Sequence, residues 1–589
     1  MTPYLPPATG TAINTDLESA NTNAPTMTRA SREDEANSLD GLVHLNGVVP
    51  VETNSPMGQS VGPFTVVMLN IGNIIGIGVF STSSSILKGT GSVGMSMIYW
   101  TIGILIAASH LAVFLEFACY FPKRSGSLVV FLEQSYPKPR YLFPIMIALV
   151  GLVLGFGSSM ALVLAKYIFQ AVGHTYTTWE LKGLAVAGYT AVIVLLTLSN
   201  RVSYWVINAM GVVKIATLAL ISVAGLAVLG GRVPTIPDPL ANFRDPFSGT
   251  ATAYGLTNAL VKIIFSYAGS GNGINVQGEL KKSGKSLRNM EFLALGATGI
   301  LFVLTNLAFF TAIPKHELEN STEIAASMFF RKVFGDSGWV RGLNVLIALC
   351  TLGSIVSTTL GLSRMTRESG RQGVIPWTRF WVSTRPFGTP LGPYAWRWAL
   401  TTLMILVVPT GDAFNFMVDL QMYPGVFFEL ALNIGLVVVR IRRRRRDEPR
   451  PQFRAWNAAL IVNTLASLAV IVMPWYPPDG GPYAGDVSFW YATYAAAGVG
   501  VLVACALYYL VKIHLMPRWG GYVIRDATVV LQDNVQTNML VKVPLGELAS
   551  LDEAHRGSPS NNSTLEPNSG KRLREQMTVT LQVPPAGIV

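Results

Sequence analysis

Long hydrophobic runs recur through the chain, and they constrain its fold more strongly than any other feature of the sequence. The first of them, residues 61–87, contains no charged side chain. It is long enough to cross a bilayer, for which a helix needs roughly 20 apolar residues. Half of the 589 residues are hydrophobic and only 13% are charged. The sequence therefore predicts an all-α integral membrane protein rather than a set of soluble domains.

Twelve runs have the length and hydrophobicity of transmembrane helices, so the chain is predicted to cross the membrane twelve times. They lie near residues 63–87, 94–119, 142–170, 181–199, 205–229, 253–277, 291–313, 339–362, 394–409, 414–439, 458–474 and 488–513. The ninth run is short, and Arg397 lies inside it. Together the runs define a transmembrane domain over residues 59–515.

The two ends of the chain differ from the spans in composition. Residues 1–58 are rich in Ser, Thr, Asn and acidic residues and have no apolar core. They are predicted to form a disordered tail without a signal peptide. Residues 516–589 are predicted to form a second tail that is also largely disordered.

The net charge of +11 arises largely from Lys and Arg in short loops between the spans, most densely at residues 440–446. This distribution is typical of membrane topology, so a nucleic-acid partner is not expected. When successive loops are assigned to alternate sides, the basic residues collect on the side of both termini. Both termini are therefore predicted to be cytoplasmic. Asn320 begins a glycosylation sequon in a loop on the other side, which is compatible with this orientation.

An enzyme is not expected from this sequence. No HExxH, paired-carboxylate or Ser/His constellation occurs inside the spans. Cys119, Cys350 and Cys505 lie within or at the edge of apolar runs, so neither a disulfide framework nor a zinc site is expected. We predict no metal and no cofactor.

The first hydrophobic run is interrupted in its middle. Gly72, Gly76 and Gly78 lie there, with Asn70 and Asn73 beside them. Each Gly weakens a helix by about 1 kcal/mol relative to Ala, so three at one depth favour local unwinding. Unwound backbone is tolerated in a membrane only where it faces protein or a water-filled cavity. The first span is therefore predicted to be a broken helix that binds a small charged molecule.

The sixth run is interrupted at the same depth. It contains Gly269, Gly271 and Gly273, together with Ser270 and Asn272. Four spans separate the two interrupted runs, so they hold corresponding places in a first and a second set of five. This pattern favours a five-plus-five inverted repeat with broken helices 1 and 6. The alternative is that small residues only allow close helix packing.

Several short motifs occur along the chain in the order known from one family of transporters. They are residues 75–80 (IGIGVF), 265–269 (FSYAG) with Glu279, Glu116 with 121–126 (FPKRSG), Ser363 with Arg364, 371–376 (RQGVIP) and 386–391 (PFGTPL). Over roughly residues 60–515 the chain resembles the fungal methionine permeases of the L-type amino-acid transporter branch. That branch belongs to the amino acid–polyamine–organocation superfamily.

The resemblance implies a secondary active transporter in the plasma membrane of a fungus. It would import neutral L-amino acids, methionine first among them, by alternating access and with proton coupling. The expected partners are the amino acid, a proton and membrane lipid. A broad neutral amino-acid exchanger and a sensor that binds an amino acid without moving it stay open as alternatives.

An amino acid carries a carboxylate and an ammonium, each of which needs partners away from water. The positive end of a helix dipole suits the carboxylate, so we assign it to the N–H groups of Gly76, Ile77 and Gly78. Carbonyl groups at the C-terminal ends of the preceding half-helices suit the ammonium. These carbonyls belong to Ile74, Phe265, Ser266 and Ala268.

Two further side chains are candidates for the substrate pocket. The resemblance implies that Phe265 acts as a lid and gate over the substrate; an ordinary core-facing or lipid-facing Phe is the alternative. Ser158, in the third span, is a candidate for the pocket lining. Ser270 departs from the large aromatic residue that is usual in the family, which bears on specificity.

Lys214 lies well inside the fifth span. A charge at this depth costs roughly 2.5–3.5 kcal/mol on insertion scales and marks a functional site by default. The resemblance implies that Lys214 takes the place of a sodium ion between spans one and eight, with Ser354 and Thr358 as its hydroxyl partners. The alternative is a lysine that snorkels toward the cytoplasm.

Two acidic residues near cytoplasmic span ends, Glu116 and Glu279, are candidates for an inner gate through pairing with basic residues. Simple placement at the membrane interface is the alternative. Asp419 and Glu429, in the tenth span, are weaker candidates for proton carriers. The external loop at residues 173–180 contains no Cys, and the resemblance then implies a permease without a disulfide-linked heavy chain.

Overall fold

The structure is a computed structural model of the chain. It describes residues 57–58, 61–122, 124–280, 285–320, 325–335, 338–407, 413–478, 480–483, 489–530 and 536–547. All of these residues belong to one compact unit.

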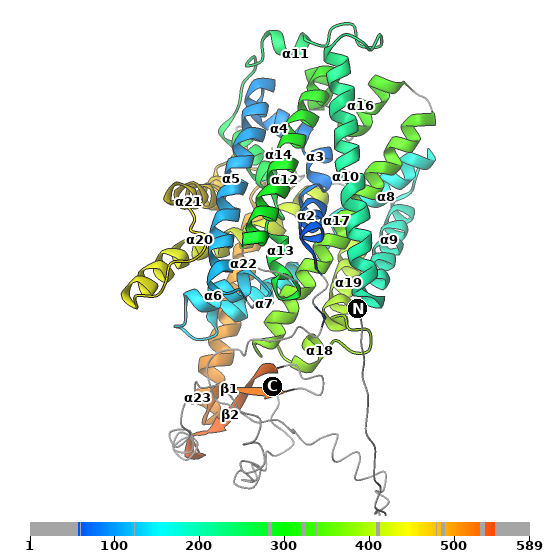
Figure 1. The fold of residues 1–589 in the computed structure, drawn as a ribbon. Coiled ribbons are helices and arrows are strands. Elements are labelled where there is room, and N and C mark those ends of the chain that lie inside the picture. Colours follow the sequence, from blue (N-terminus) through cyan, green and yellow to red (C-terminus); the bar gives the residue numbers. More distant parts are fainter. Residues whose placement is uncertain are drawn as a thin grey trace, which may run out of the picture. The chain divides into compact units, whose positions relative to one another are not determined.

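The described residues are mostly helical (Figure 1). The N-terminal half contains α2 (Pro63–Ile74), α3 (Ile77–Ser81), α4 (Ser83–Thr90), α5 (Val93–Tyr120), α6 (Leu128–Ser135), α7 (Leu142–Leu154), α8 (Ser158–Val172), α9 (Thr178–Leu198), α10 (Asn200–Leu229), α11 (Ala241–Arg244), α12 (Ala253–Tyr267), α13 (Asn272–Asn275) and η1 (Gln277–Glu279). The C-terminal half contains α14 (Lys285–Ala312), α15 (Lys315–Asn320), α16 (Ala325–Phe334), α17 (Gly338–Arg371), α18 (Thr378–Val382), α19 (Leu391–Val407), α20 (Ala413–Arg445), α21 (Asn457–Val472), η2 (Met473–Trp475), α22 (Thr493–Tyr509), η3 (Leu510–Leu515), α23 (Met516–Gly520), β1 (Tyr522–Val530), β2 (Gln536–Pro544) and η4 (Leu545–Glu547).

Ten helical segments of the described chain are long and apolar enough to cross a membrane. They are Pro63–Ser81, Val93–Tyr120, Leu142–Val172, Thr178–Leu198, Asn200–Leu229, Ser286–Ala312, Val340–Arg371, Phe416–Arg445, Asn457–Trp475 and Thr493–Gly520. Each matches one of the twelve predicted spans. The other two predicted spans correspond to α12 and α19, which have 15 and 17 residues and fall short in length. The prediction of an integral membrane protein built from helices is confirmed.

The outer surfaces of the long helices are apolar. Leu105 on α5, Val223 on α10 and Ile300 on α14 are each exposed over more than half of their surface. Side chains of this kind face lipid at no cost, because hydrocarbon surrounds the helix there. The interior of the bundle instead surrounds α2, which packs against α10, α14 and α17 (Figure 1). This arrangement places the interrupted first span at the centre of the protein.

Local sequence signals mark where several helices begin. Thr177 and Glu180 form a capping box at the start of α9, in which each side chain bonds the other residue's backbone. Such a box satisfies two N–H groups that the helix itself leaves free. Ser199 and Thr252 accept a backbone hydrogen bond in the same way at the starts of α10 and α12.

The third predicted span is not one continuous helix. It consists of α7 and α8, which are separated by Gly155, Phe156 and Gly157. Side chains from distant helices satisfy the backbone of this break. Gln421 Nε2 donates to the Leu154 carbonyl at 3.1 Å and to the Phe156 carbonyl at 2.6 Å. The Gly157 N–H donates to Thr401 Oγ1 at 2.9 Å. The predicted span over residues 142–170 is present as the segment Leu142–Val172, and the break inside it was not predicted.

The C-terminal tail contains an antiparallel hairpin that the sequence analysis did not predict. Strand β1 pairs with β2, so that Tyr522 lies opposite Pro544. Both strands are rich in β-branched residues, which favour extended backbone. Thr537 Oγ1 donates to the carbonyl of Arg371, at the end of α17, at 3.1 Å. The predicted disorder of residues 1–56 and 548–589 lies outside the described residues.

Candidate substrate and coupling site

The predicted break in the first span is present. Helix α2 ends at Ile74, and α3 begins at Ile77 after Gly76. The Gly76 N–H donates to the Ile74 carbonyl at 2.8 Å. Ile77 and Gly78 lie in the first turn of α3, where the N–H groups have no acceptor within the helix. Of the three N–H groups assigned to a carboxylate, two are therefore in the expected environment and that of Gly76 already has a local acceptor.

The predicted break in the sixth span is also present. Helix α12 ends at Tyr267, and α13 begins at Asn272. Between them, Gly269 and Gly271 have φ angles of +101° and +86°. Residues with a Cβ rarely adopt these values, so glycine is needed at both positions. The break thus follows directly from the glycine pattern of the sequence.

The two breaks lie against each other. A Cβ on Gly78 would lie 2.8 Å from Ser266 Cα, so only glycine allows this approach. The hydroxyls of Thr82 and Ser266 are 2.8 Å apart, and Asn73 Nδ2 donates to the Gly269 carbonyl at 3.3 Å. The interrupted segments of α2–α3 and α12–α13 therefore form two walls of one site.

Buried polar side chains hold the second wall in place. The Gly273 N–H donates to Asn70 Oδ1 at 3.3 Å, and Asn272 Nδ2 donates to the Ser357 carbonyl at 3.2 Å. The Gly271 N–H donates to Glu291 Oε2 on α14 at 3.1 Å. Glu291 is only 1% exposed, and the sequence analysis did not single it out. Its position at the start of an apolar run was the signal that could have identified it.

Lys214 contacts the first break from behind. Its ammonium donates to the carbonyls of Gly72 and Ile75 at 2.6 and 2.5 Å, and to Ser354 Oγ at 2.5 Å. Lys214 is fully buried and does not snorkel toward an interface. Of the two predicted hydroxyl partners, Ser354 contacts the ammonium, whereas Thr358 donates to Asn73. A fixed cation thus satisfies carbonyls that the break in α2 leaves without helical donors.

The other predicted substrate residues occupy three environments. Phe265 and Ala268 are half-buried at the end of α12, where the Ala268 N–H donates to the Phe265 carbonyl at 3.1 Å. Ser266 is buried, and its hydroxyl donates to the Lys262 carbonyl at 2.8 Å. Ser158 begins α8, away from these contacts, and its hydroxyl donates to Met417 Sδ at 2.7 Å. A carbonyl oxygen has two lone pairs, so the Phe265 and Ile74 carbonyls can each accept a second hydrogen bond.

The two predicted gate acids do not lie together. Glu279 forms an ion pair with Arg364 at 3.0 Å, in which both side chains are fully buried. Tyr204 O–H also donates to Glu279 Oε2, at 2.6 Å. Glu116 instead pairs with Arg440 of α20 at 2.5 Å and accepts the Ala455 N–H at 2.8 Å. Glu279 therefore connects the sixth span to α10 and α17, whereas Glu116 connects α5 to α20 and the loop before α21.

A further ion cluster joins Arg124 and Glu133 to Glu368 and Arg371 on α17. Arg124 lies 2.9 Å from each carboxylate, and Arg371 lies 2.7 Å from Glu368. Burial raises the pKa of the Glu133 carboxyl more than Arg124 lowers it. Burial would lower the pKa of Arg124, but the two carboxylates raise it above its ordinary value. Arg124 and Arg371 belong to the quoted motifs, although the sequence did not show that they meet.

A second intramembrane ion pair was missed. Lys262, on α12, lies 2.8 Å from Asp419 of α20 and is 1% exposed. Lys262 precedes Ser266 by one turn, so the pair connects α20 to the end of the broken sixth span. The signal in the sequence was one basic residue in the sixth run and two acidic residues, Asp419 and Glu429, in the tenth. Asp419 was noted as a candidate proton carrier, together with Glu429, whereas Lys262 was not noted.

The described residues contain no group of three or more His, Cys, Asp or Glu side chains that could hold a metal ion. Within the same residues the two walls of the site present backbone amides, carbonyls, hydroxyls, asparagine amides, the Glu291 carboxyl group and Lys214. Two broken helices that meet inside a membrane bundle are typical of transporters.

Comparison with known proteins agrees with this class. The family model described as amino acid permease matches residues 61–503, so the chain belongs to the amino acid permease family and is a transporter rather than an enzyme. The chain is 30% identical over 513 residues to the high-affinity methionine permease of Saccharomyces cerevisiae, covering 86% of this chain and 88% of that protein.

Two other relatives are more distant. The low-affinity methionine permease of Saccharomyces cerevisiae is 26% identical over 495 residues, which cover 83% of this chain and 89% of that protein. The b(0,+)-type amino acid transporter 1 of Mus musculus is 24% identical over 514 residues, which cover 86% of this chain and 97% of that protein. The resemblance stated from the sequence motifs is confirmed.

The contact between Gly78 and Ser266 leads to a testable prediction. Gly78→Ala is expected to lower amino-acid uptake into proteoliposomes at least tenfold, because the new methyl group forces the two broken helices apart. Gly183→Ala on α9 is the matched control, since a Cβ there meets no atom within 4 Å. Equal uptake by the two variants would contradict a functional contact at Gly78.

Proposed function

We propose that this protein is a secondary active transporter that imports neutral L-amino acids by alternating access, with methionine as the first candidate substrate. The observation that carries the proposal is the contact between the two interrupted helices at Gly78 and Ser266. Membership in the amino acid permease family supports amino acids as the substrate class. The names of two relatives, both methionine permeases, support methionine.

In this proposal the substrate binds between the two breaks. Its carboxylate accepts hydrogen bonds from the first turn of α3, at Ile77 and Gly78, with Gly76 providing the turn. Its ammonium donates to the carbonyls of Ile74, Phe265, Ser266 and Ala268. Burial of this region supports the assignment, because a buried charge needs direct partners. Phe265 covers the site, and Ser158 contributes to the wall that faces the substrate side chain.

We propose that uptake is coupled to protons through Lys214. Its ammonium holds the C-terminal end of α2 through two carbonyls and Ser354, and Thr358 holds Asn73 at the same break. Loss of a proton from Lys214 would remove at least one of these hydrogen bonds and loosen the break. Such a change would link protonation to the geometry of the carboxylate site.

The ion pairs at Glu279 and Glu116 are proposed to close the cytoplasmic side. Glu279 is the stronger candidate, since it lies at the end of the broken sixth span and its pair with Arg364 is fully buried. Opening of a pathway past α13 would require this pair to separate. Glu116 pairs with Arg440 near the ends of α5 and α20 and is the second gate residue in this proposal.

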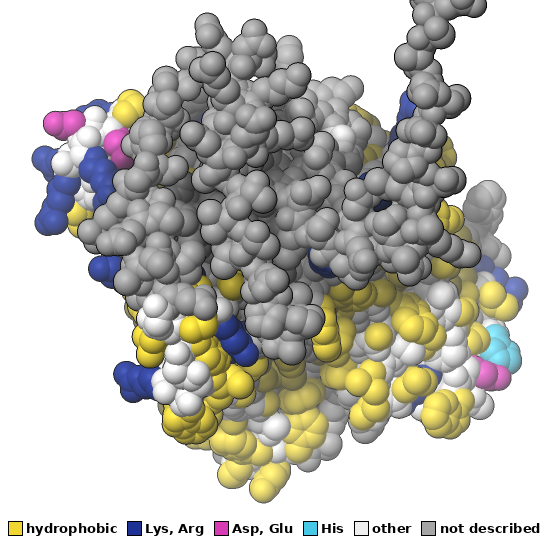
Figure 2. Space-filling view, turned by 90° about the horizontal axis from the view of Figure 1, so that it is seen from below, with side chains coloured by type: hydrophobic (Ala, Val, Ile, Leu, Met, Phe, Trp, Pro, Cys, Tyr) yellow, Lys and Arg dark blue, Asp and Glu magenta, His cyan; other side chains and the backbone are white. Residues whose placement is uncertain are grey.

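We also propose that α12 and α19 complete a set of twelve membrane-spanning helices and that the first ten form a five-plus-five inverted repeat. Both termini would then be cytoplasmic, in the plasma membrane of a fungus. The end of the bundle seen in Figure 2 carries several Lys and Arg side chains around its edge. Arg442, Arg443, Arg444 and Arg445 at the end of α20 supply a basic cluster of the kind that stays on the cytoplasmic side.

Uptake of labelled L-methionine into proteoliposomes, with and without an inward proton gradient, tests the proposal. We expect accumulation that rises with the gradient and that unlabelled neutral amino acids inhibit. Accumulation that needs an internal amino acid instead of a gradient would identify an exchanger. Binding of methionine without uptake would identify a sensor and refute the transport proposal. Full activity of the purified chain alone would support function without a disulfide-linked heavy chain.

A further inference from the structure

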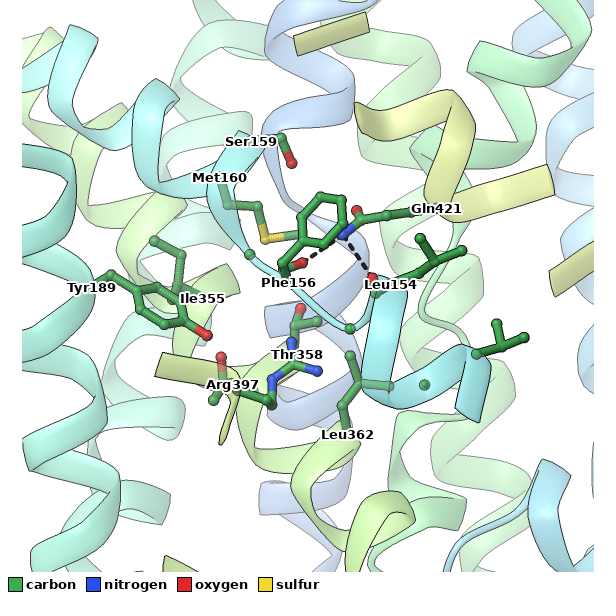
Figure 3. A pocket seen from close by; sticks show the side chains of 15 residues that line it. Leu154, Phe156, Ser159, Met160, Tyr189, Ile355, Thr358, Leu362, Arg397 and Gln421 are labelled. Carbon is green, nitrogen blue, oxygen red and sulfur yellow. Dashed lines mark hydrogen bonds between the residues drawn. The ribbon is translucent and has the colours of Figure 1, made fainter. Parts of the chain in front are cut away.

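The break between α7 and α8 opens a cavity of about 220 Å³ inside the bundle (Figure 3). One wall is the break itself, from Leu154 to Gly157, and the others come from α9, α17, α19 and α20. Water occupies about 30 Å³ per molecule in the liquid, so the cavity has room for a small organic molecule. None of the fifteen lining residues is acidic.

Arg397 of α19 reaches into this cavity (Figure 3). It is only 4% exposed, and its Nε has no hydrogen-bond partner in the part of the chain that the structure describes. No ion pair of Arg397 is found among those residues either. A buried cation without a counter-charge is strongly unfavourable in a protein interior, and more so at membrane depth. Its retention at this place indicates that a negative group belongs beside it.

The surroundings of Arg397 fit a negative group. A Cβ on Gly155 would lie 3.2 Å from Arg397 Nη1, so the guanidinium packs closely against the glycine break. The hydroxyl of Tyr189 lines the same cavity, and it is also buried without a partner among the described residues. Helix α8 begins at Ser158, directly after this break, and the N–H groups of its first turn have no acceptor within the helix. Two donors without partners among the described residues, the Arg397 Nε and the Tyr189 hydroxyl, therefore belong to the lining of one largely apolar cavity.

We propose that this cavity binds a small carboxylate through the guanidinium of Arg397 and the hydroxyl of Tyr189. A planar guanidinium can bind the two oxygens of a carboxylate with two parallel hydrogen bonds. It therefore fits a carboxylate better than it fits a spherical anion. The walls formed by Leu154, Phe156 and Leu362 accept the apolar part of such a ligand. This assignment does not rest on transport, since it concerns binding to the purified protein.

The cavity shares one residue with the coupling site. Thr358 lines the cavity and donates to Asn73, which in turn contacts Gly269 of the second break. The carboxylate could be a free anion that binds beside the transported amino acid, or it could be carried on the side chain of that amino acid. Both sources present the same group to Arg397, and a competition experiment separates them.

Thermal unfolding of the purified full chain in sodium acetate, against sodium chloride at equal ionic strength, tests the site. We expect acetate to raise the midpoint temperature in a saturable manner. Arg397→Gln should weaken the apparent affinity for acetate at least tenfold, and Tyr189→Phe about threefold. Arg201→Gln, which changes an exposed arginine at the start of α10, should leave it unchanged. Arg397→Lys keeps the charge and should retain part of the response if the Gln variant fails to fold.

The proposal is overturned if the parent protein does not respond to acetate, if chloride stabilises it equally, or if Arg397→Gln responds like the parent. Competition then identifies the source. L-glutamate that displaces both acetate and labelled L-methionine would place the carboxylate on a transported amino acid. Simultaneous binding of acetate and L-methionine would identify a free anion. Both results support the site, and both must disappear in Arg397→Gln.

Discussion

Lys214→Met is expected to reduce the initial rate of amino-acid uptake by at least a hundredfold. The substitution keeps an unbranched side chain of similar length but removes the ammonium that donates to Gly72, Ile75 and Ser354. Hydrogen bonds to charged groups contribute about 1.5–3 kcal/mol each, and buried acceptors left without donors carry a further cost. The measurement is uptake of labelled L-methionine into proteoliposomes that contain equal amounts of folded protein.

Lys182→Met provides the matched control for this experiment. Lys182 is also a buried lysine whose ammonium donates to a backbone carbonyl, that of Leu406, at 2.8 Å. It lies on α9, away from both breaks, so uptake should stay near the level of the parent protein. Lys214→Arg should keep the charge but not the geometry, because a guanidinium cannot reach three acceptors around one nitrogen. Unchanged uptake with unchanged proton dependence in Lys214→Met would remove Lys214 from the coupling site.

The two helix breaks could be predicted from the sequence because the physical rule behind them is local. Gly269 and Gly271 adopt backbone angles with positive φ, which residues with a Cβ rarely adopt. Gly76 lies between α2 and α3, at the N-terminal cap of α3. Lys214 could be predicted for a similar reason, since a charge deep inside a hydrophobic run is costly wherever the chain folds. For both the helix breaks and Lys214, the residues that determine the feature lie within a few positions of it in the sequence.

The break in the third span could not be predicted in this way. Two glycines at 155 and 157 are tolerated in many helices, and the decisive contacts come from Gln421 and Thr401, more than two hundred residues further along the chain. The ion pair between Lys262 and Asp419 depends equally on tertiary packing, since 157 residues separate the two. Sequence patterns identify groups that need a partner, but packing decides which partner they find.

The C-terminal hairpin illustrates a different limit. Its strands lie in a polar tail, where the alternation of side chains is weak and a two-stranded sheet alone is marginally stable. The hairpin contacts the end of α17 through Thr537 and the Arg371 carbonyl. This tertiary contact stabilises the hairpin, and it cannot be predicted from the sequence of the tail.

Arg364→Met is expected to be the most destabilising single substitution among the buried ion pairs described above. Arg364 donates to Glu279 at 3.0 Å, to Tyr394 O–H at 2.7 Å and to Asn200 Oδ1 at 2.8 Å, and both charged side chains are fully buried. Removing one partner leaves the other charge uncompensated, which costs about 3–5 kcal/mol. The measurement is the free energy of unfolding of the purified protein, by denaturant titration in a fixed detergent.

A surface pair supplies the comparison. Arg244 and Asp238 form an ion pair at 2.7 Å in which the side chains are 71% and 40% exposed. Exposed ion pairs contribute about 0–1 kcal/mol to the free energy of unfolding, so Arg244→Met should change it little.

The double variant Arg364→Met, Glu279→Gln should recover part of the lost stability, because it also removes the carboxylate charge that Arg364→Met leaves without a partner. Such recovery would show that the buried carboxylate, rather than the lost volume of arginine, destabilises the single variant. If Arg364→Met proved as stable as Arg244→Met, the buried pair would have no part in holding the sixth span against α17.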